Sequence, residues 1–147
     1  MKSIVIYSSH RNNTAQIALV IAQVANCNLV ELTKTFDSST LSLDEYDLIF
    51  LGTGIRGGEP YTELLSFIKK ADLGSGKRFV LFMTWAGGGA SDKLAYQGVK
   101  DALELRGQHL DSDYFTCFGK TFGFVRRGRP NENDVAEAKK WATEKLK

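Results

Sequence analysis

Seven consecutive polar residues, Ser8 to Thr14, bring together hydroxyl, amide and guanidinium groups and include no acid. All of these groups donate hydrogen bonds, and Arg11 adds a full positive charge. An apolar segment precedes the run, and a segment with helical spacing follows it. Free N–H groups and the positive dipole end of such a helix would point into the run. The sequence therefore predicts a site for a phosphomonoester, the alternative being a surface turn in which Asn13 or Thr14 only caps the helix.

Two glycine-containing segments, residues 52–58 and 84–89, have the composition of loops that contact a flat ligand. Glycine permits positive φ angles and a close approach of the backbone to a ring. The first segment lacks the Lys-Ser/Thr ending of a P-loop. Trp85 directly follows an apolar run, so we interpret it as a ring-contacting aromatic, with packing in the core as the alternative. Tyr61 is the weaker candidate because it also fits the apolar face of a helix.

The elements that must position these segments alternate between strand and helix. Strands are expected at residues 3–7, 29–32, 47–51, 79–83 and within 111–119. Helices are expected at residues 14–25, from Pro60 onward, after Ser91, and from residues 130–133 to about Leu146. In this interpretation Gly52-Thr53-Gly54 closes the third strand, Pro60 lies in a first helical turn and Ser91 is an N-cap.

Several of these strands are continuously apolar, which is typical of a parallel sheet covered on both faces. The sequence therefore predicts an α/β fold, a doubly wound five-stranded sheet in three α/β/α layers. In such sheets a ligand binds outside the carboxyl ends of the strands, where the strand order reverses. The polar run and the two glycine segments all follow strands, so we expect them at that edge.

The bulk properties fit one globular domain over residues 1–147, with 43% hydrophobic and 24% charged residues. Cys27 and Cys117 form neither a CxxC pair nor a metal-ligand spacing, and we expect reduced thiols, with Cys117 buried in an aromatic strand. No apolar run approaches the ~20 residues of a membrane helix, and the N-terminus has no signal-peptide pattern. A cytoplasmic protein without membrane insertion or a bound metal is expected.

The run from Tyr7 to Thr14 resembles the phosphate-binding loop of the flavodoxin family, and the two glycine segments resemble its two flavin loops. The resemblance continues through Cys117-Phe118-Gly119 and Arg129-Pro130-Asn131-Glu132, as in a short-chain bacterial and archaeal branch. It implies FMN as the cofactor and the strand order 2-1-3-4-5. The cofactor-binding residues that it implies are Ser8, Ser9, His10, Arg11, Asn12, Asn13, Thr14, Thr53, Gly54, Ile55, Arg56, Gly57, Thr84, Trp85, Ala86, Gly87 and Gly88.

Two residues of the first loop depart from the family pattern. Asn12 stands where glycine is usual, so a left-handed backbone there would carry a modest strain that asparagine tolerates. Arg11 replaces a small hydroxyl residue and either contacts the phosphate or points into water.

The charge balance also differs from that of typical, strongly acidic flavodoxins. The net charge is +2, and basic residues alternate with aromatic ones near the C-terminus. The basic residues are Lys120, Arg126, Arg127 and Arg129, and the aromatic ones are Tyr114, Phe115, Phe118, Phe122 and Phe124. We interpret this pattern as strand packing with a basic rim that suits an acidic redox partner or an anionic substrate, not nucleic acid. The nearly all-apolar helix at residues 15–25 predicts a homodimer through Leu19 and Val20, or else a tolerated apolar patch.

The sequence is compatible with three functions. An electron carrier that shuttles electrons between redox partners is preferred to an enzyme that converts a substrate. The alternatives are an FMN-dependent reductase of a small molecule, such as a quinone or porphyrin precursor, and a flavin-free interaction module. A phosphorelay receiver is excluded because no carboxylate follows the first or third strand, although Thr84 and Lys120 lie near where receivers keep such residues.

Overall fold

The fold is built on a parallel sheet whose strands run in the order β2-β1-β3-β5-β6. The computed structural model describes residues 1–120 and 127–147. The parallel strands are β1 (Ser3–Tyr7), β2 (Asn28–Glu31), β3 (Leu48–Arg56), β5 (Arg78–Trp85) and β6 (Leu110–Phe118). A two-residue strand, β4 (Glu59–Pro60), pairs antiparallel with the end of β3. Counting the parallel strands alone gives 2-1-3-4-5, which confirms the expected order.

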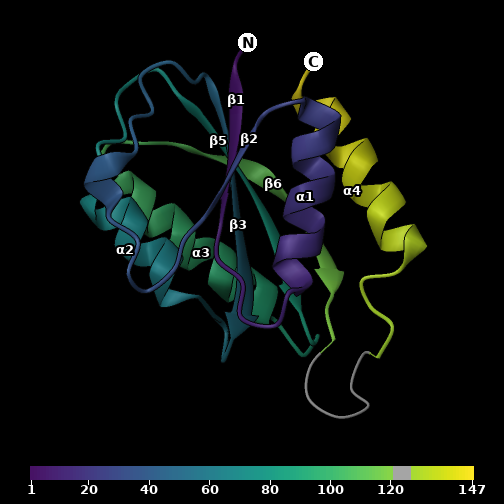
Figure 1. Ribbon diagram of the computed structural model, residues 1–147. Helices are drawn as coiled ribbons and strands as arrows, with labels where there is room; N and C mark the ends of the chain where they lie inside the picture. The colour runs from purple at the N-terminus through teal and green to yellow at the C-terminus, as the bar shows by residue number, and fades with distance from the viewer. Residues whose placement is uncertain (121–126) are drawn as a thin grey trace.

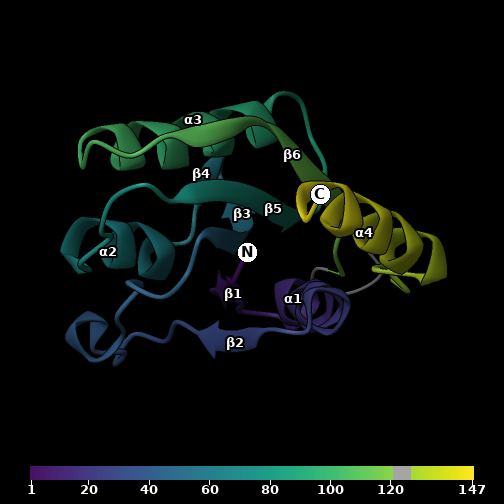
Figure 2. The ribbon, with the colours of Figure 1, turned by 90° about the horizontal axis from the view of Figure 1, so that it is seen from above.

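Helices cover both faces of this sheet, so the three-layer prediction is confirmed (Figures 1 and 2). One face carries α1 (Asn13–Ala25) and α4 (Glu132–Lys145), and the other carries α2 (Thr62–Lys70) and α3 (Ser91–Glu104). A 3-10 helix, η1 (Ser38–Thr40), lies between β2 and β3. Among the described residues, no helix is long and apolar enough to cross a lipid bilayer.

The central strands are apolar throughout because alternate side chains enter two separate cores. Ile4 and Ile6 of β1 lie in the core under α2 and α3, while Val5 lies in the core under α1 and α4. Phe50 and Phe82 fill the second core and are fully buried. Each large side chain buried in this way contributes about 1.5–3 kcal/mol, so the two cores hold the sheet as a rigid support for its loops.

Helix α1 is apolar over much of its surface because a second helix, α4, packs against it. Helix α4 lies beside α1 (Figure 1), and Ala138 and Ala142 of α4 share a core with Ile17 and Ile21. The side chain of Leu19 stays half-exposed. Self-association through Leu19 and Val20 therefore stays a prediction.

Three local expectations are wrong. Strand β3 does not end at Leu51 before a closing Gly52-Thr53-Gly54 but continues to Arg56, because residues 52–54 pair with β5. The chain instead turns at Gly57 and Gly58, which have φ angles of 59° and 79°. Pro60 belongs to β4 rather than to a helix, which begins at Thr62. Ser91 is the first residue of α3, and no side chain caps that helix.

Helix α4 has the strongest cap of the described helices. Asn131 and Asp134 form a reciprocal capping box, and Arg129 holds the Asp134 carboxylate through two bonds of 2.6 Å. The guanidinium of Arg129 keeps the pKa of the Asp134 carboxyl below its usual range. Cys117 lies nearby and is buried, as expected, and burial raises the pKa of its thiol to about 12. This thiol is therefore unreactive near neutral pH.

The ring of Phe82 leaves no room for a side chain at Gly52. A Cβ atom at this position would lie 2.2 Å from Cζ of Phe82. We expect Gly52→Ala to lower the free energy of unfolding by about 1–3 kcal/mol, because both residues are fixed in the sheet. Urea unfolding of Gly52→Ala, Phe82→Leu and the double variant measures the coupling. The double variant should cost less than the sum of the single variants, and additive costs would contradict the steric explanation.

Candidate ligand site

A cavity of about 450 Å³ opens where the carboxyl ends of β1, β3 and β5 meet. Its lining residues are His10, Arg11, Asn13, Ile55, Arg56, Tyr61, Thr84, Trp85, Ala86 and Gly119. All three segments singled out in the sequence contribute to it. The other residues singled out do not line it: Ser8, Ser9, Asn12, Thr14, Thr53, Gly54, Gly57, Gly87 and Gly88.

The first loop leaves the N-terminus of α1 open. Asn12 is the N-cap and takes the expected left-handed conformation, with φ 63° and ψ 6°. The Asn12 side chain makes no capping hydrogen bond, and the side chains of Asn13 and Thr14 bond to Lys120 and Thr84, so the capping alternative for Asn13 and Thr14 is wrong. Of the first-turn amides, that of Ala15 donates to Ser9 Oγ at 3.3 Å. The open helix end therefore presents backbone N–H groups and the positive end of the dipole beside Arg11.

Buried polar side chains join the loops to one another. Thr14 Oγ1 and Thr84 Oγ1 lie 2.8 Å apart and are shielded from solvent. The Asn13 amide donates to the carbonyl of Lys120 at 2.6 Å. Thr53 Oγ1 accepts from the backbone N–H of Tyr61 at 2.9 Å. These groups fix the shape of the cavity, and the polar side chains that line it from the first loop are His10, Arg11 and Asn13.

A carboxylate from another element contacts the first loop, although residues 8–14 themselves include no acid. Glu63, in the first turn of α2, accepts a hydrogen bond from Ser8 Oγ at 2.8 Å. The same carboxylate oxygen lies 2.5 Å from His10 Nε2, and the other accepts from Thr62 Oγ1 at 3.1 Å. Burial raises the pKa of the Glu63 carboxyl, but the hydrogen bonds from His10, Ser8 and Thr62 outweigh it and leave the pKa below its usual value. An ionised Glu63 thus ties the loop to α2.

Tyr61 is a residue of the cavity rather than of the helix face. Its ring stacks on His10, with centroids 3.7 Å apart and planes 5° apart. A Cβ atom at Gly54 would lie 2.3 Å from Tyr61 Cζ, so glycine there makes room for this ring. Trp85 also lines the cavity, and its ring lies 6.2 Å from that of Phe118 between centroids. Two aromatic side chains thus border a space of the size that small ligands occupy.

A second hollow of about 530 Å³ adjoins the same loop and is basic. Its lining residues are Arg11, Asn12, Asn13, Gln16, Lys120, Arg127, Gly128, Arg129 and Pro130. These include three of the basic residues noted in the sequence, while Arg126, Phe122 and Phe124 lie outside the described residues. Arg11, Lys120 and Arg127 contribute positive charge to this hollow, and the Asp134 carboxylate offsets that of Arg129.

Comparison with known proteins identifies the family and supports the fold. The family model described as "Flavodoxin domain" matches residues 4–123. An uncharacterised protein of Methanocaldococcus jannaschii is 31% identical over all of this chain and 99% of its own length. Oxidised flavodoxin 1 of Bacillus cereus superposes with a TM-score of 0.73 at 22% identity, covering 99% of this chain and 97% of the flavodoxin. The flavodiiron core of Flv1 from Synechocystis superposes with a TM-score of 0.72 at 14% identity, covering 98% of this chain and 34% of that protein.

Replacement of Glu63 tests the tie between α2 and the first loop. We expect Glu63→Gln to cost about 1 kcal/mol of folding free energy at pH 7, because the charged acceptor of Ser8 and His10 is lost. The folded-state pKa lies below the unfolded value, so the wild-type advantage is present above about pH 5 and is lost as the pH falls through the folded pKa. Urea unfolding from pH 3 to 8 measures this difference in the free energy of unfolding between the wild type and Glu63→Gln. Glu59→Gln is a control at an exposed position. An advantage that does not change with pH would refute the explanation.

Proposed function

This chain belongs to the flavodoxin family, and we propose that it binds FMN and transfers electrons between redox partners. The observation that carries the proposal is the open N-terminus of α1, which adjoins a cavity bordered by two aromatic side chains. A phosphate monoester suits the helix end, and a flat ring suits the cavity. The flavin would supply the redox chemistry, and the protein would supply binding and electrostatics.

The two parts of FMN would be held by different groups. The backbone N–H groups at the start of α1 and the Arg11 side chain would hold the phosphate, with Asn12 setting the loop's left-handed turn. The residues that would border the ring are Ile55, Arg56, Tyr61, Thr84, Trp85 and Ala86. The buried Thr14–Thr84 hydrogen bond would hold the phosphate-binding residues in a fixed position relative to the residues that border the ring.

The basic hollow beside the loop favours an acidic partner surface. Arg11 lines both the hollow and the proposed flavin cavity, so a partner docked there would approach the cofactor closely. Positive charge at this rim would speed the encounter with an acidic protein at low salt. Added salt should therefore slow electron transfer to such a partner.

One observation favours the alternative, an FMN-dependent reductase of a small molecule. The sequence offers no evident general acid, but the structure places His10 in the cavity with Glu63 hydrogen-bonded to it. A histidine held by a carboxylate is a common proton donor in catalysis. This pair would deliver a proton to a reduced substrate such as a quinone.

Anaerobic reduction of the FMN-loaded protein separates these functions. A carrier should accept electrons in two resolved one-electron steps and turn over quinone slowly, without dependence on His10. A reductase should turn over quinone rapidly, and His10→Gln should lower the rate. Failure to take up FMN would leave only the flavin-free interaction module.

The Arg11 side chain gives a specific prediction. We expect Arg11→Gln to weaken FMN binding more than tenfold and leave riboflavin binding unchanged, because a charge-assisted bond to phosphate contributes about 1.5–3 kcal/mol. Quenching of flavin fluorescence measures both affinities. Lys140→Gln, which removes a charge from exposed α4, is the matched control. Equal weakening of both ligands would place Arg11 at the ring instead of the phosphate.

A further inference from the structure

Arg56 is the last residue of β3 and lines the cavity at the strand ends. Alternate residues of a strand share one face, so Arg56 follows Gly54, the glycine that makes room for the Tyr61 ring. The chain turns directly after Arg56, at Gly57 and Gly58. The end of β3 therefore carries a positive charge to the side of the cavity that Tyr61 borders.

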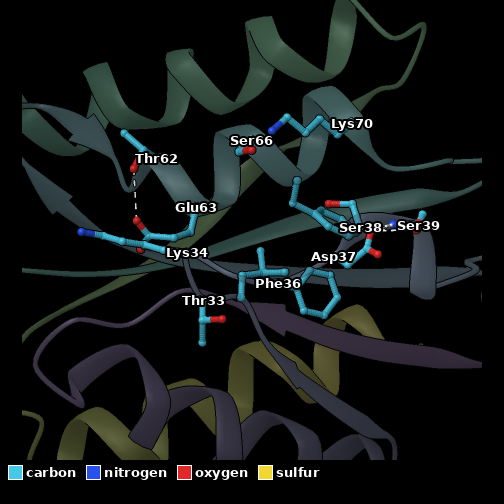
Figure 3. A pocket seen from close by; sticks show the side chains of 12 residues that line it. Thr33, Lys34, Phe36, Asp37, Ser38, Ser39, Thr62, Glu63, Ser66 and Lys70 are labelled. Atoms are coloured by element: carbon cyan, nitrogen blue, oxygen red, sulfur yellow. Dashed lines mark hydrogen bonds between the residues drawn. The ribbon is translucent and has the colours of Figure 1, made fainter.

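The lining of this cavity contains positive charge that no lining acid offsets. It includes the guanidinium groups of Arg11 and Arg56 but no acid from the described part of the chain. Glu63, which contacts the first loop, lines a different groove beside α2, where Thr62 donates a hydrogen bond to it (Figure 3). Glu59 lies opposite Arg56 in the β3–β4 pairing, but no ion pair joins Arg56 to this or any other acid in the described segments.

The Tyr61 hydroxyl responds to the charges around the cavity. Burial raises the pKa of this hydroxyl. The positive charge of Arg11 lowers the same pKa, the Glu63 carboxylate raises it, and the positive charge of Arg56 lowers it. Both guanidinium groups thus stabilise negative charge at the Tyr61 ring.

We propose that Arg56 raises the reduction potential of the bound cofactor by stabilising its reduced, anionic ring. This inference rests on the proposed binding of FMN, in which Arg11 holds the phosphate and Arg56 borders the ring. Full reduction of the neutral flavin ring takes up two electrons and one proton near neutral pH, so the ring gains one negative charge. The phosphate carries the same charge before and after reduction, so its attraction to Arg56 cancels in the ratio of the two affinities. Arg56 would therefore bind reduced FMN more tightly than oxidised FMN.

Potentiometric titration of the FMN-loaded protein, with dithionite as the reductant, tests the proposal. We expect Arg56→Gln to lower the ratio of the affinities for reduced and oxidised FMN about threefold, as for an exposed charge pair. This change corresponds to a potential lower by about 14 mV for a two-electron couple. Arg56→Glu reverses the charge and should lower the ratio about tenfold, whereas Arg56→Lys should keep it. Added salt should shrink these differences, because Arg56 is exposed.

A lysine outside the cavity provides the matched control. Lys69 is exposed in the last turn of α2 and does not line the cavity, so Lys69→Gln should leave the potential unchanged. Quenching of flavin fluorescence first establishes whether FMN is taken up, and a protein that takes up none contradicts the proposed function together with this inference. If FMN binds, equal potentials in the wild type, Arg56→Gln and Arg56→Glu, or an equal shift in Lys69→Gln, would overturn the inference alone.

Discussion

The candidate site depends on one structural constraint, the left-handed backbone of Asn12, which begins α1 without a capping bond from its own side chain. A capped helix would spend its first-turn N–H groups on its own residues. Here the chain turns sharply after β1, the Ala15 amide donates to Ser9, and the amides of Asn13 and Thr14 face the loop with the dipole's positive end. Asparagine tolerates this conformation better than other non-glycine residues, so the strain is small. Arg11 then adds a full charge where the family usually has a hydroxyl.

The rest of the molecule fixes the position of the α1 N-terminus relative to the carboxyl ends of the strands. The two cores fix β1, β3 and β5, and the buried Thr14–Thr84 hydrogen bond joins the first loop to the end of β5. Glu63 joins the same loop to α2. A ligand would therefore meet a preformed site and would pay little to order it.

Much of this arrangement follows from the sequence. The alternation of apolar strands and helices predicted the layers, and the polar run predicted the first loop, whereas the conformation of Asn12 was expected from the resemblance to the flavodoxin family. The glycines of β3 were misinterpreted because glycine in a turn and glycine under a ring look alike in sequence. Gly52 and Gly54 make room for Phe82 and Tyr61, which come from other elements. The pairing of Glu63 with His10 spans 53 positions, so no local pattern could have indicated it.

Calorimetric titration of the apo-protein with FMN and with riboflavin tests the central claim directly. The two ligands share the ring and differ in the phosphate, so their ratio of affinities isolates the contribution of the phosphate site formed by the open helix end and Arg11. We predict that FMN binds roughly 100-fold more tightly than riboflavin, equivalent to about 2.7 kcal/mol. Equal affinities, or no heat with either ligand, would contradict the claim that the start of α1 is a phosphate site.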